Sequence, residues 1–157
     1  MLRIEQVEFL DADAQTLVAE VQAEYVTRYG GPDKTPIDAT VFTPPAGDFF
    51  VGYLDNVPVA MGGWRFRPDV ERLGGRRLAE VKRMYVAPTG RRRGLARALL
   101  MHLERTAAEA GADVMILETG LEQPEAIALY ESEGYELVEK FGYYAESPIS
   151  RGYGKRL

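Results

Sequence analysis

The sequence predicts an α/β (α+β) fold, with a mixed sheet that is antiparallel except for one parallel crossover in its middle. Two patterns point to this class. Residues 48–66 read as two strands joined by a tight turn, which makes an antiparallel hairpin. Residues 78–118 read as strand, helix and strand, and such a unit places its two strands parallel. The 157 residues correspond to one domain at roughly 100–200 residues per domain.

The N-terminal part of the chain is expected to form one strand and one long helix. Residues 2–7 alternate weakly between apolar and polar side chains, as in a strand. Asp11 or Asp13 can cap a helix that runs to about Arg28, because apolar residues recur there at helical spacing. Glycines end this helix, and a proline-rich loop follows over residues 32–47.

The hairpin and the crossover unit make up the middle of the chain. The hairpin strands span residues 48–54 and 57–66, and Asp55-Asn56 suit the tight turn between them. After a polar loop, residues 78–86 read as a strand, which a proline stops. The next helix runs from about Arg91 to Ala110, where a glycine ends it.

The C-terminal part completes the sheet. Residues 114–118 form a short apolar run suited to a buried strand. Pro124 suits the first position of a helix that runs to about Glu133. Residues 135–140 and 150–157 read as the final strands.

The composition excludes several classes of site. The chain has no cysteine, which excludes disulfides, thiolate metal sites and a cysteine nucleophile. His102 is the only histidine and lies on the flank of an apolar helix stripe, so a structural role is favoured and no metal site is expected. No apolar run approaches the roughly 20 residues of a membrane span, and the N-terminus lacks the apolar stretch of a signal peptide. We therefore expect a cytoplasmic protein.

Charge is unevenly distributed along the chain. The formal net charge is −5. The stretch from Arg72 to Arg97 contains nine basic residues and one acid, Glu80, so it carries +8 and leaves −13 for the rest. A charge run is often a solvated face. A local positive field on an acidic protein nevertheless suits a small polyanionic ligand better than a nucleic acid.

The segment from Val81 to Arg97 joins a strand, a loop with two glycines and the start of a helix. A helix N-terminus has unpaired backbone N–H groups and the positive end of the helix dipole, which together bind phosphate. Gly94 allows close approach of a pyrophosphate, and the small Ala96 lets the helix pack near it. Three arginines before Gly94 add charged donors. The alternative is a helix with a basic first turn and no ligand.

Two motifs of the chain, which follow one another in the order typical of the family, resemble those of the GNAT (N-acetyltransferase) superfamily. The chain resembles a small single-domain member of bacterial type. Its pyrophosphate motif, R/Q-x-x-G-x-G/A, matches Arg91, Gly94 and Ala96. The segment from Gln123 to Tyr135 is similar to N-x-x-A-x-x-L-Y-x-x-x-G-F/Y. The chain departs from these patterns at Gln123, where asparagine is commoner, and at Arg92, where many members have glycine. The resemblance covers roughly residues 48–140.

The resemblance implies a fold and a donor substrate. The GNAT fold has a mostly antiparallel central sheet with a splayed parallel pair in the middle and helices on both faces. The donor is acetyl-CoA or a related acyl-CoA, whose pantetheine arm lies along Met84, Tyr85 and Val86 like an added strand. The other cofactor-binding residues implied are Arg91, Arg92, Arg93, Gly94, Leu95, Ala96, Arg97 and Gln123. Many members also form a homodimer through their C-terminal strands.

The resemblance also implies a general base. Glu80 lies eleven residues before the pyrophosphate motif, the spacing of the base in some members. On a regularly alternating strand Glu80 shares a face with Lys82, Met84 and Val86. It would take the proton of the amine directly or through water. The alternative is a structural ion pair of Glu80 with Lys82, Arg83, Arg76 or Arg77.

Tyr130 matches the tyrosine that in many members protonates the departing CoA thiolate. Its alternative role is core packing near Ala126 and Ile127. The N–H of Met84 or Tyr85 would stabilise the oxyanion. The candidates for the acceptor pocket, which can equally be core residues, are Tyr29, Trp64, Tyr143 and Tyr144.

The sequence thus predicts an N-acetyltransferase that moves an acetyl group directly to a primary amine of a small molecule, peptide or protein. Two alternatives stay open. A non-catalytic acyl-CoA-binding or sensor domain would share the fold and the ligand without turnover. A nucleic-acid-binding module would use the basic stretch 72–97, although the overall charge and the lack of interleaved exposed aromatic residues disfavour it.

Overall fold

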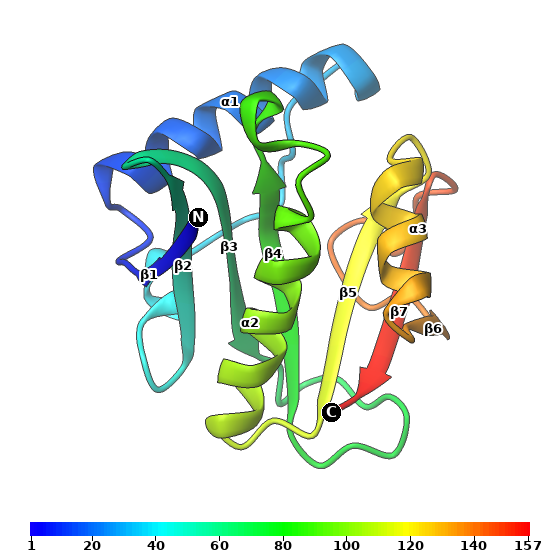
Figure 1. The fold of residues 1–157 in the computed structure, drawn as a ribbon. Coiled ribbons are helices and arrows are strands. Elements are labelled where there is room, and N and C mark those ends of the chain that lie inside the picture. The colour runs from blue at the N-terminus through cyan, green and yellow to red at the C-terminus, as the bar shows by residue number, and fades with distance from the viewer.

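The computed structural model describes all 157 residues and contains a seven-stranded sheet in the order β1-β2-β3-β4-β5-β7-β6 (Figure 1). Neighbouring strands are antiparallel except for β4 and β5, which are parallel. The predicted mixed sheet with one parallel pair in its middle is therefore confirmed. The strands are β1 (Leu2–Gln6), β2 (Gly47–Leu54), β3 (Val57–Phe66), β4 (Leu78–Val86), β5 (Val114–Gly120), β6 (Glu136–Val138) and β7 (Ser150–Arg156).

Three α-helices cover the two faces of the sheet, α1 on one face and α2 with α3 on the other (Figure 1). Phe49 of β2 packs with Leu17 of α1, and the next residue, Phe50, packs with Leu99 of α2 on the opposite face. None of the helices is both long enough and apolar enough to cross a membrane. The helices are α1 (Ala12–Tyr29), α2 (Leu95–Glu109) and α3 (Pro124–Ser132), with 3-10 turns at Ala39–Phe42 and Pro88–Gly90.

Two local signals in the sequence behave as predicted. Asp11 caps α1, because its carboxylate accepts hydrogen bonds from the backbone N–H groups of Asp13 (3.0 Å) and Ala14 (3.3 Å). Asp55 and Asn56 have φ values of 49° and 65° in the tight turn between β2 and β3. Positive φ at both positions matches the twist of a two-residue hairpin. The second strand of this hairpin, β3, lies beside β4, and β4 borders the candidate site.

β4 contains a β-bulge at Arg83, whose φ is 56°. The register with β3 shifts at this point, and one extra residue reverses the alternation of side chains. Glu80 and Lys82 therefore lie on the face opposite α2, whereas Met84 and Val86 pack against the hydrophobic core under α2. The prediction that Glu80 shares a face with Met84 and Val86 is wrong, because it assumed a regular strand.

β4 and β5 pair only at their first residues. The paired positions are Leu78 with Val114, Ala79 with Met115, and Glu80 with Ile116. Beyond Glu80, β4 continues to Val86 without a partner on its β5 side, and the two strands diverge (Figure 1). The predicted splayed parallel pair is confirmed.

α2 begins later than the sequence predicts. The prediction places its start at Arg91, but the helix begins at Leu95. Arg92 and Gly94 have φ values of 63° and 74°, which lie in the left-handed region and do not fit a right-handed helix. Residues 91–94 therefore form a loop that widens the connection between β4 and α2.

Candidate active site

The loop between β4 and α2 leads into a helix N-terminus whose backbone donors are free. The N-cap, Gly94, has no side chain, and the Ala98 N–H donates to the Gly94 carbonyl (3.1 Å). The N–H groups of Leu95, Ala96 and Arg97 thus lack an intrahelical acceptor. A Cβ at Gly94 would meet nothing within 4 Å, so the space beside these donors is open. This arrangement can bind a phosphate group.

The arginines around this loop differ in their contacts. Arg91 donates to the backbone of β4 through Nε (3.0 Å), and its guanidinium pairs with Glu24 on α1. Arg97 forms an ion pair with a glutamate at the end of α3. Arg92 and Arg93 are exposed and their side chains make no hydrogen bond or ion pair. Two of the four arginines thus shape the loop, and the other two are free to meet an anion.

A cavity of about 100 Å³, called here the small cavity, lies where β4 and β5 diverge. Its lining includes residues 80–84 of β4, residues 117–119 of β5 and Tyr130 of α3. Of the three residues assigned to the pantetheine arm, Met84 lines this cavity. Because of the bulge, Tyr85 points into the hydrophobic core under α1, and Val86 packs against the core under α2. Backbone groups on the unpaired edge of β4 border the same space.

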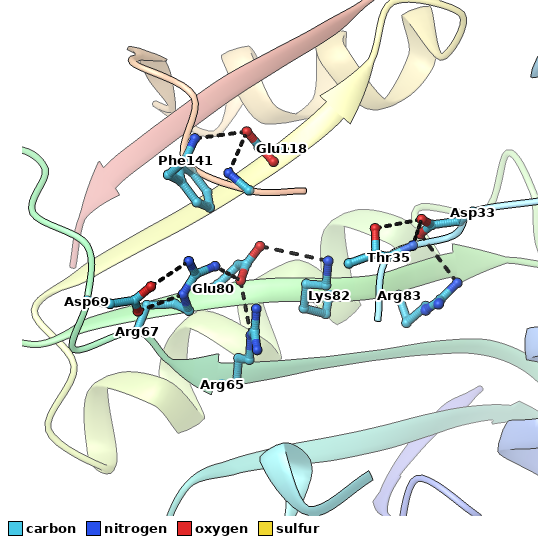
Figure 2. A network of polar contacts seen from close by, with 11 residues as sticks. Asp33, Thr35, Arg65, Arg67, Asp69, Glu80, Lys82, Arg83, Glu118 and Phe141 are labelled. Carbon is cyan, nitrogen blue, oxygen red and sulfur yellow. Dashed lines mark hydrogen bonds and ion pairs between the residues drawn. The ribbon is translucent and has the colours of Figure 1, made fainter. Parts of the chain in front are cut away.

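Glu80 is the centre of a buried ion-pair cluster (Figure 2). Its side chain is 2% exposed, and Oε1 accepts hydrogen bonds from Arg67 Nη1 (2.7 Å) and Arg65 Nε (3.1 Å). Lys82 Nζ lies 3.9 Å from Oε2, and burial lowers the pKa of Lys82. The ion pair that the sequence left open is present, with Lys82 as one of the named partners but with Arg65 and Arg67 instead of Arg83 or an arginine at 76–77.

Tyr130 brings a phenol from α3 to the small cavity. Its side chain is buried and packs edge-on against Tyr135, with ring centroids 5.8 Å apart, and tilted against Tyr153 at 6.4 Å. The Tyr130 hydroxyl makes no hydrogen bond within the chain. Burial raises the pKa of this phenol well above its ordinary value. The structure therefore presents a protonated, unpartnered hydroxyl beside the gap between β4 and β5.

A second cavity of about 440 Å³, called here the large cavity, shares part of its wall with the small one. Its walls come from the end of α1, residues 30–34, the end of β5 and residues 144–150. Tyr29 and Tyr144, two of the predicted acceptor residues, line it. Gln123 lines both cavities and donates from Nε2 to the Tyr29 hydroxyl (3.3 Å).

The other predicted aromatic residues differ in position. Trp64 lies outside both cavities: it is buried under α2, and Nε1 donates to Thr106 Oγ1 (3.0 Å). Its assignment to the acceptor pocket is therefore corrected to the core. Tyr143 lines the small cavity and packs edge-on against Tyr144 at 4.9 Å. His102 packs edge-on against a phenylalanine of β2 at 4.5 Å, far along α2 from the loop.

Sequence reasoning assigned no role to Glu118, which lines both cavities from β5. Its Oε2 accepts hydrogen bonds from the backbone N–H groups of Phe141 (3.0 Å) and Gly142 (3.1 Å) (Figure 2). Glu118 makes no ion pair. The available signal was a carboxylate at the end of an otherwise apolar strand, beside the strand expected to border the ligand.

Comparisons with known proteins identify the family of the chain. The profile of the Acetyltransferase (GNAT) family matches residues 14–135. An IAA acetyltransferase of Azospirillum brasilense is 44% identical over 71 residues, which are 45% of this chain and 46% of that protein. The match thus spans about half the length of this curated relative.

Solved structures share the fold over the whole chain. A Klebsiella pneumoniae protein assigned as an acyl-CoA N-acyltransferase has a TM-score of 0.82 and 26% identity, covering 100% of this chain and 98% of that one. The ribosomal-protein-alanine N-acetyltransferase of Brucella melitensis has a TM-score of 0.70 and 22% identity, covering 99% of each chain. Because the family profile spans well over half of the residues, the chain belongs to the acetyltransferase (GNAT) family.

Proposed function

We propose that the protein is a single-domain N-acetyltransferase that moves an acetyl group from acetyl-CoA directly to a primary amine. One observation carries this proposal: the free N–H groups at the start of α2 and the gap between β4 and β5 lie at the same end of β4. A donor with a pyrophosphate at one end and a thioester on an extended arm fits this arrangement. The family of the chain supports the same donor.

The donor would bind in two parts. Its pyrophosphate would accept hydrogen bonds from the backbone of residues 94–97, with the guanidinium groups of Arg92 and Arg93 beside it. Its pantetheine arm would pair with the free edge of β4, as an added strand does. The thioester then reaches the small cavity, which Met84 and Tyr130 line.

Acyl transfer to an amine needs an oxyanion donor, an acid for the thiolate and an acceptor for the proton of the amine. The N–H of Met84 or Tyr85, just after the bulge, is our candidate for the oxyanion. The Tyr130 hydroxyl is our candidate acid, because burial keeps it protonated and no neighbour engages it. The nitrogen attacks the carbonyl carbon and the C–S bond breaks. The thiolate takes the Tyr130 proton, the nitrogen loses its extra proton to a base or to water, and Tyr130 regains a proton from solvent.

Glu80 is the base that the sequence implies, and its contacts weigh against that role. Both guanidinium groups, of Arg65 and Arg67, bind the same oxygen, and Lys82 stands near the other. Both oxygens of this buried carboxylate thus face cationic side chains. We therefore assign Glu80 a structural role in this cluster. The alternative, in which Glu80 accepts a proton through a water molecule on Oε2, is tested with the Glu80→Gln variant.

The experiment is a measurement of thiol release from acetyl-CoA across a panel of primary amines, namely spermidine, 2-phenylethylamine, tyramine, glycine and a lysine-containing peptide. Release that depends on one of these amines, with the acetylated amine identified by mass spectrometry, supports the proposal. Saturable CoA binding without turnover on any amine would instead favour the acyl-CoA sensor. The panel also identifies the acceptor class.

A further inference from the structure

Arg83 on β4 is a buried cation whose hydrogen-bond donors have no acceptor. Its side chain is 8% exposed, and Nε and Nη1 are buried without a hydrogen bond. Arg67, whose side chain is 11% exposed, shows the ordinary arrangement, because its guanidinium donates to the carboxylates of Glu80 and Asp69. Buried N–H groups without a partner are rare, since each has lost its hydrogen bonds to water. The donors of Arg83 are therefore available to a ligand.

Asp33 is the one carboxylate in contact with Arg83. Its Oδ2 lies 3.4 Å from Arg83 Nη1, in a contact that lacks the geometry of a hydrogen bond. The other oxygen, Oδ1, accepts hydrogen bonds from the backbone N–H and the hydroxyl of Thr35 (2.9 and 2.6 Å). Asp33 therefore balances the charge of Arg83 without satisfying its N–H groups.

Lys82, the residue before Arg83, is a second cation with free donors in the small cavity (Figure 2). Its Nζ makes no hydrogen bond and lies 3.9 Å from Glu80 Oε2, the nearest carboxylate oxygen. Burial lowers the pKa of Lys82, as expected for an ammonium group without close acceptors. Two neighbouring side chains thus offer charged N–H groups to the same space.

The bulge of β4 brings these two cations to one cavity. On a regular strand consecutive side chains point to opposite faces, so Lys82 and Arg83 would be separated by the sheet. The φ of 56° at Arg83 breaks this alternation, and both side chains line the small cavity. A positive φ is unfavourable for a residue with a long side chain, and bulges beside active sites commonly redirect a side chain. The backbone conformation therefore supports a role for the Arg83 side chain in this cavity.

We propose that Lys82 and Arg83 bind a carboxylate group of the acceptor, so that the protein acetylates amino acids or other amines that carry a carboxylate. The inference rests on the proposed acetyl transfer and names its acceptor class. A guanidinium fits a carboxylate through two parallel N–H···O bonds, and an ammonium group adds a further charged donor. The opposite wall of the small cavity, from β5, carries the carboxylate of Glu118 and no cation. The two poles of a zwitterion thus match the two walls.

The sizes of the two cavities agree with such an acceptor. The small cavity, of about 100 Å³, has room for the amino and carboxylate groups. The body of the acceptor would extend into the large cavity, of about 440 Å³, which shares part of its wall with the small one. Tyr25, Tyr29 and Tyr144 line the large cavity, and their rings suit an apolar or aromatic body.

The test compares amines that differ only in a carboxylate. L-phenylalanine is matched with 2-phenylethylamine, and 4-aminobutyrate, whose carboxylate lies further from the nitrogen, with propylamine. We expect the wild type to favour the carboxylated member of at least one pair at least about tenfold in kcat/KM, the scale of one charged hydrogen bond.

Arg83→Gln should remove this preference. We expect the KM for the carboxylated amine to rise at least about tenfold, while kcat/KM for its partner changes less than about threefold. Because both proteins act on the same two amines, differences in the reactivity of the amines cancel. Arg76→Gln is the control for lost charge and should match the wild type: Arg76 is exposed, its side chain makes no hydrogen bond or ion pair, and it lines neither cavity.

The outcomes separate this inference from the proposed function. An active wild type without preference in either pair overturns the inference alone, and so does an Arg83→Gln variant that keeps the preference. An equal loss on both members of a pair would place Arg83 at the donor or the transition state and also overturns it. If the wild type acetylates no amine, the proposed function fails. Calorimetry of the CoA complex with the same amines then tests the carboxylate site by itself: binding of the carboxylated member alone supports it, and any other result contradicts it.

Circular dichroism and the Kd of acetyl-CoA report whether Arg83→Gln folds. If it does not, Lys82→Gln takes its place. We expect that variant to reduce the preference for the carboxylated amine at least about threefold, and an unchanged preference contradicts the inference.

Discussion

Glu80 on β4 lies opposite Ile116 on β5, and this pair is the last at which the two parallel strands meet. The ion pairs of Glu80 with Arg65 and Arg67 therefore lie at the closed end of the cleft. Glu118, further along β5, stands where the strands have separated. Two carboxylates on neighbouring strands thus have different surroundings, one sealed by cations and one open to a ligand.

We expect Glu80→Gln to reduce stability more than it affects proton removal. Loss of this buried carboxylate leaves Arg67, which is 11% exposed, with only a surface aspartate as partner. Breaking one side of a buried ion pair costs about 3 kcal/mol, which urea unfolding will measure. The pH profile of kcat/KM should keep its acidic limb. A variant that is as stable as the wild type but has lost that limb would return the role of base to Glu80.

Gly94→Glu should abolish binding of acetyl-CoA. The new side chain places a negative charge where the backbone donors of α2 are open, and it repels a pyrophosphate. We expect the Kd from titration calorimetry to rise at least about a hundredfold, or about 2.7 kcal/mol. Gly94→Ala imposes the same strain at φ 74° without the charge, so it serves as the control. Wild-type affinity in the glutamate variant would place the pyrophosphate elsewhere.

Tyr130→Phe should slow turnover without weakening the donor complex. The Tyr130 hydroxyl has no partner in the chain, so phenylalanine keeps the packing against Tyr135 and Tyr153 and the melting temperature should hold. Loss of the acid should lower kcat by about a hundredfold, while the Kd of acetyl-CoA changes less than about twofold. Steady-state kinetics with the best amine of the panel measure this. Undiminished turnover would leave Tyr130 as a packing residue.

Buried phenols should make the fold sensitive to alkali. The pKa of Tyr25 is about 12 in the folded protein against 10.0 for an ordinary tyrosine, so above pH 10 the folded state holds more protons than the unfolded state. The stabilisation is complete below about pH 10 and is lost as the pH rises toward 12, by up to about 2.7 kcal/mol for this one group. Urea unfolding at several pH values should show a shallower decline for Tyr25→Phe. Tyr143→Phe, at an exposed position, should decline like the wild type.

Local patterns predicted most of the fold, and irregular backbone accounts for the errors. Alternation and turn residues identified the hairpin, and Asp11 caps α1 as expected. The bulge at Arg83 left no signal, because an arginine with φ 56° is not marked by glycine or proline. For this reason the prediction that Glu80 and Met84 lie on the same face of β4 is wrong.

A sequence motif predicted one part of the candidate site, but contacts between residues distant in sequence determine the rest. The glycine and alanine of the pyrophosphate motif lie at the start of α2, with their backbone donors free. The orientation of Glu118 depends on hydrogen bonds to its Oε2 from the backbone N–H groups of Phe141 and Gly142, which are distant from it in sequence. The two arginines that bind Glu80 likewise come from the end of β3 and the residue just after it, which spacing along β4 could not reveal.

Glu24 and Tyr25 are consecutive on α1, yet the first anchors Arg91 of the loop before α2 and the second lines both cavities. Rotation of α1 about its axis would therefore change the walls of both cavities only by releasing that arginine. Under the proposed function, substrate range is therefore more easily changed in residues 30–34 and 144–150, which line the large cavity without anchoring the loop before α2.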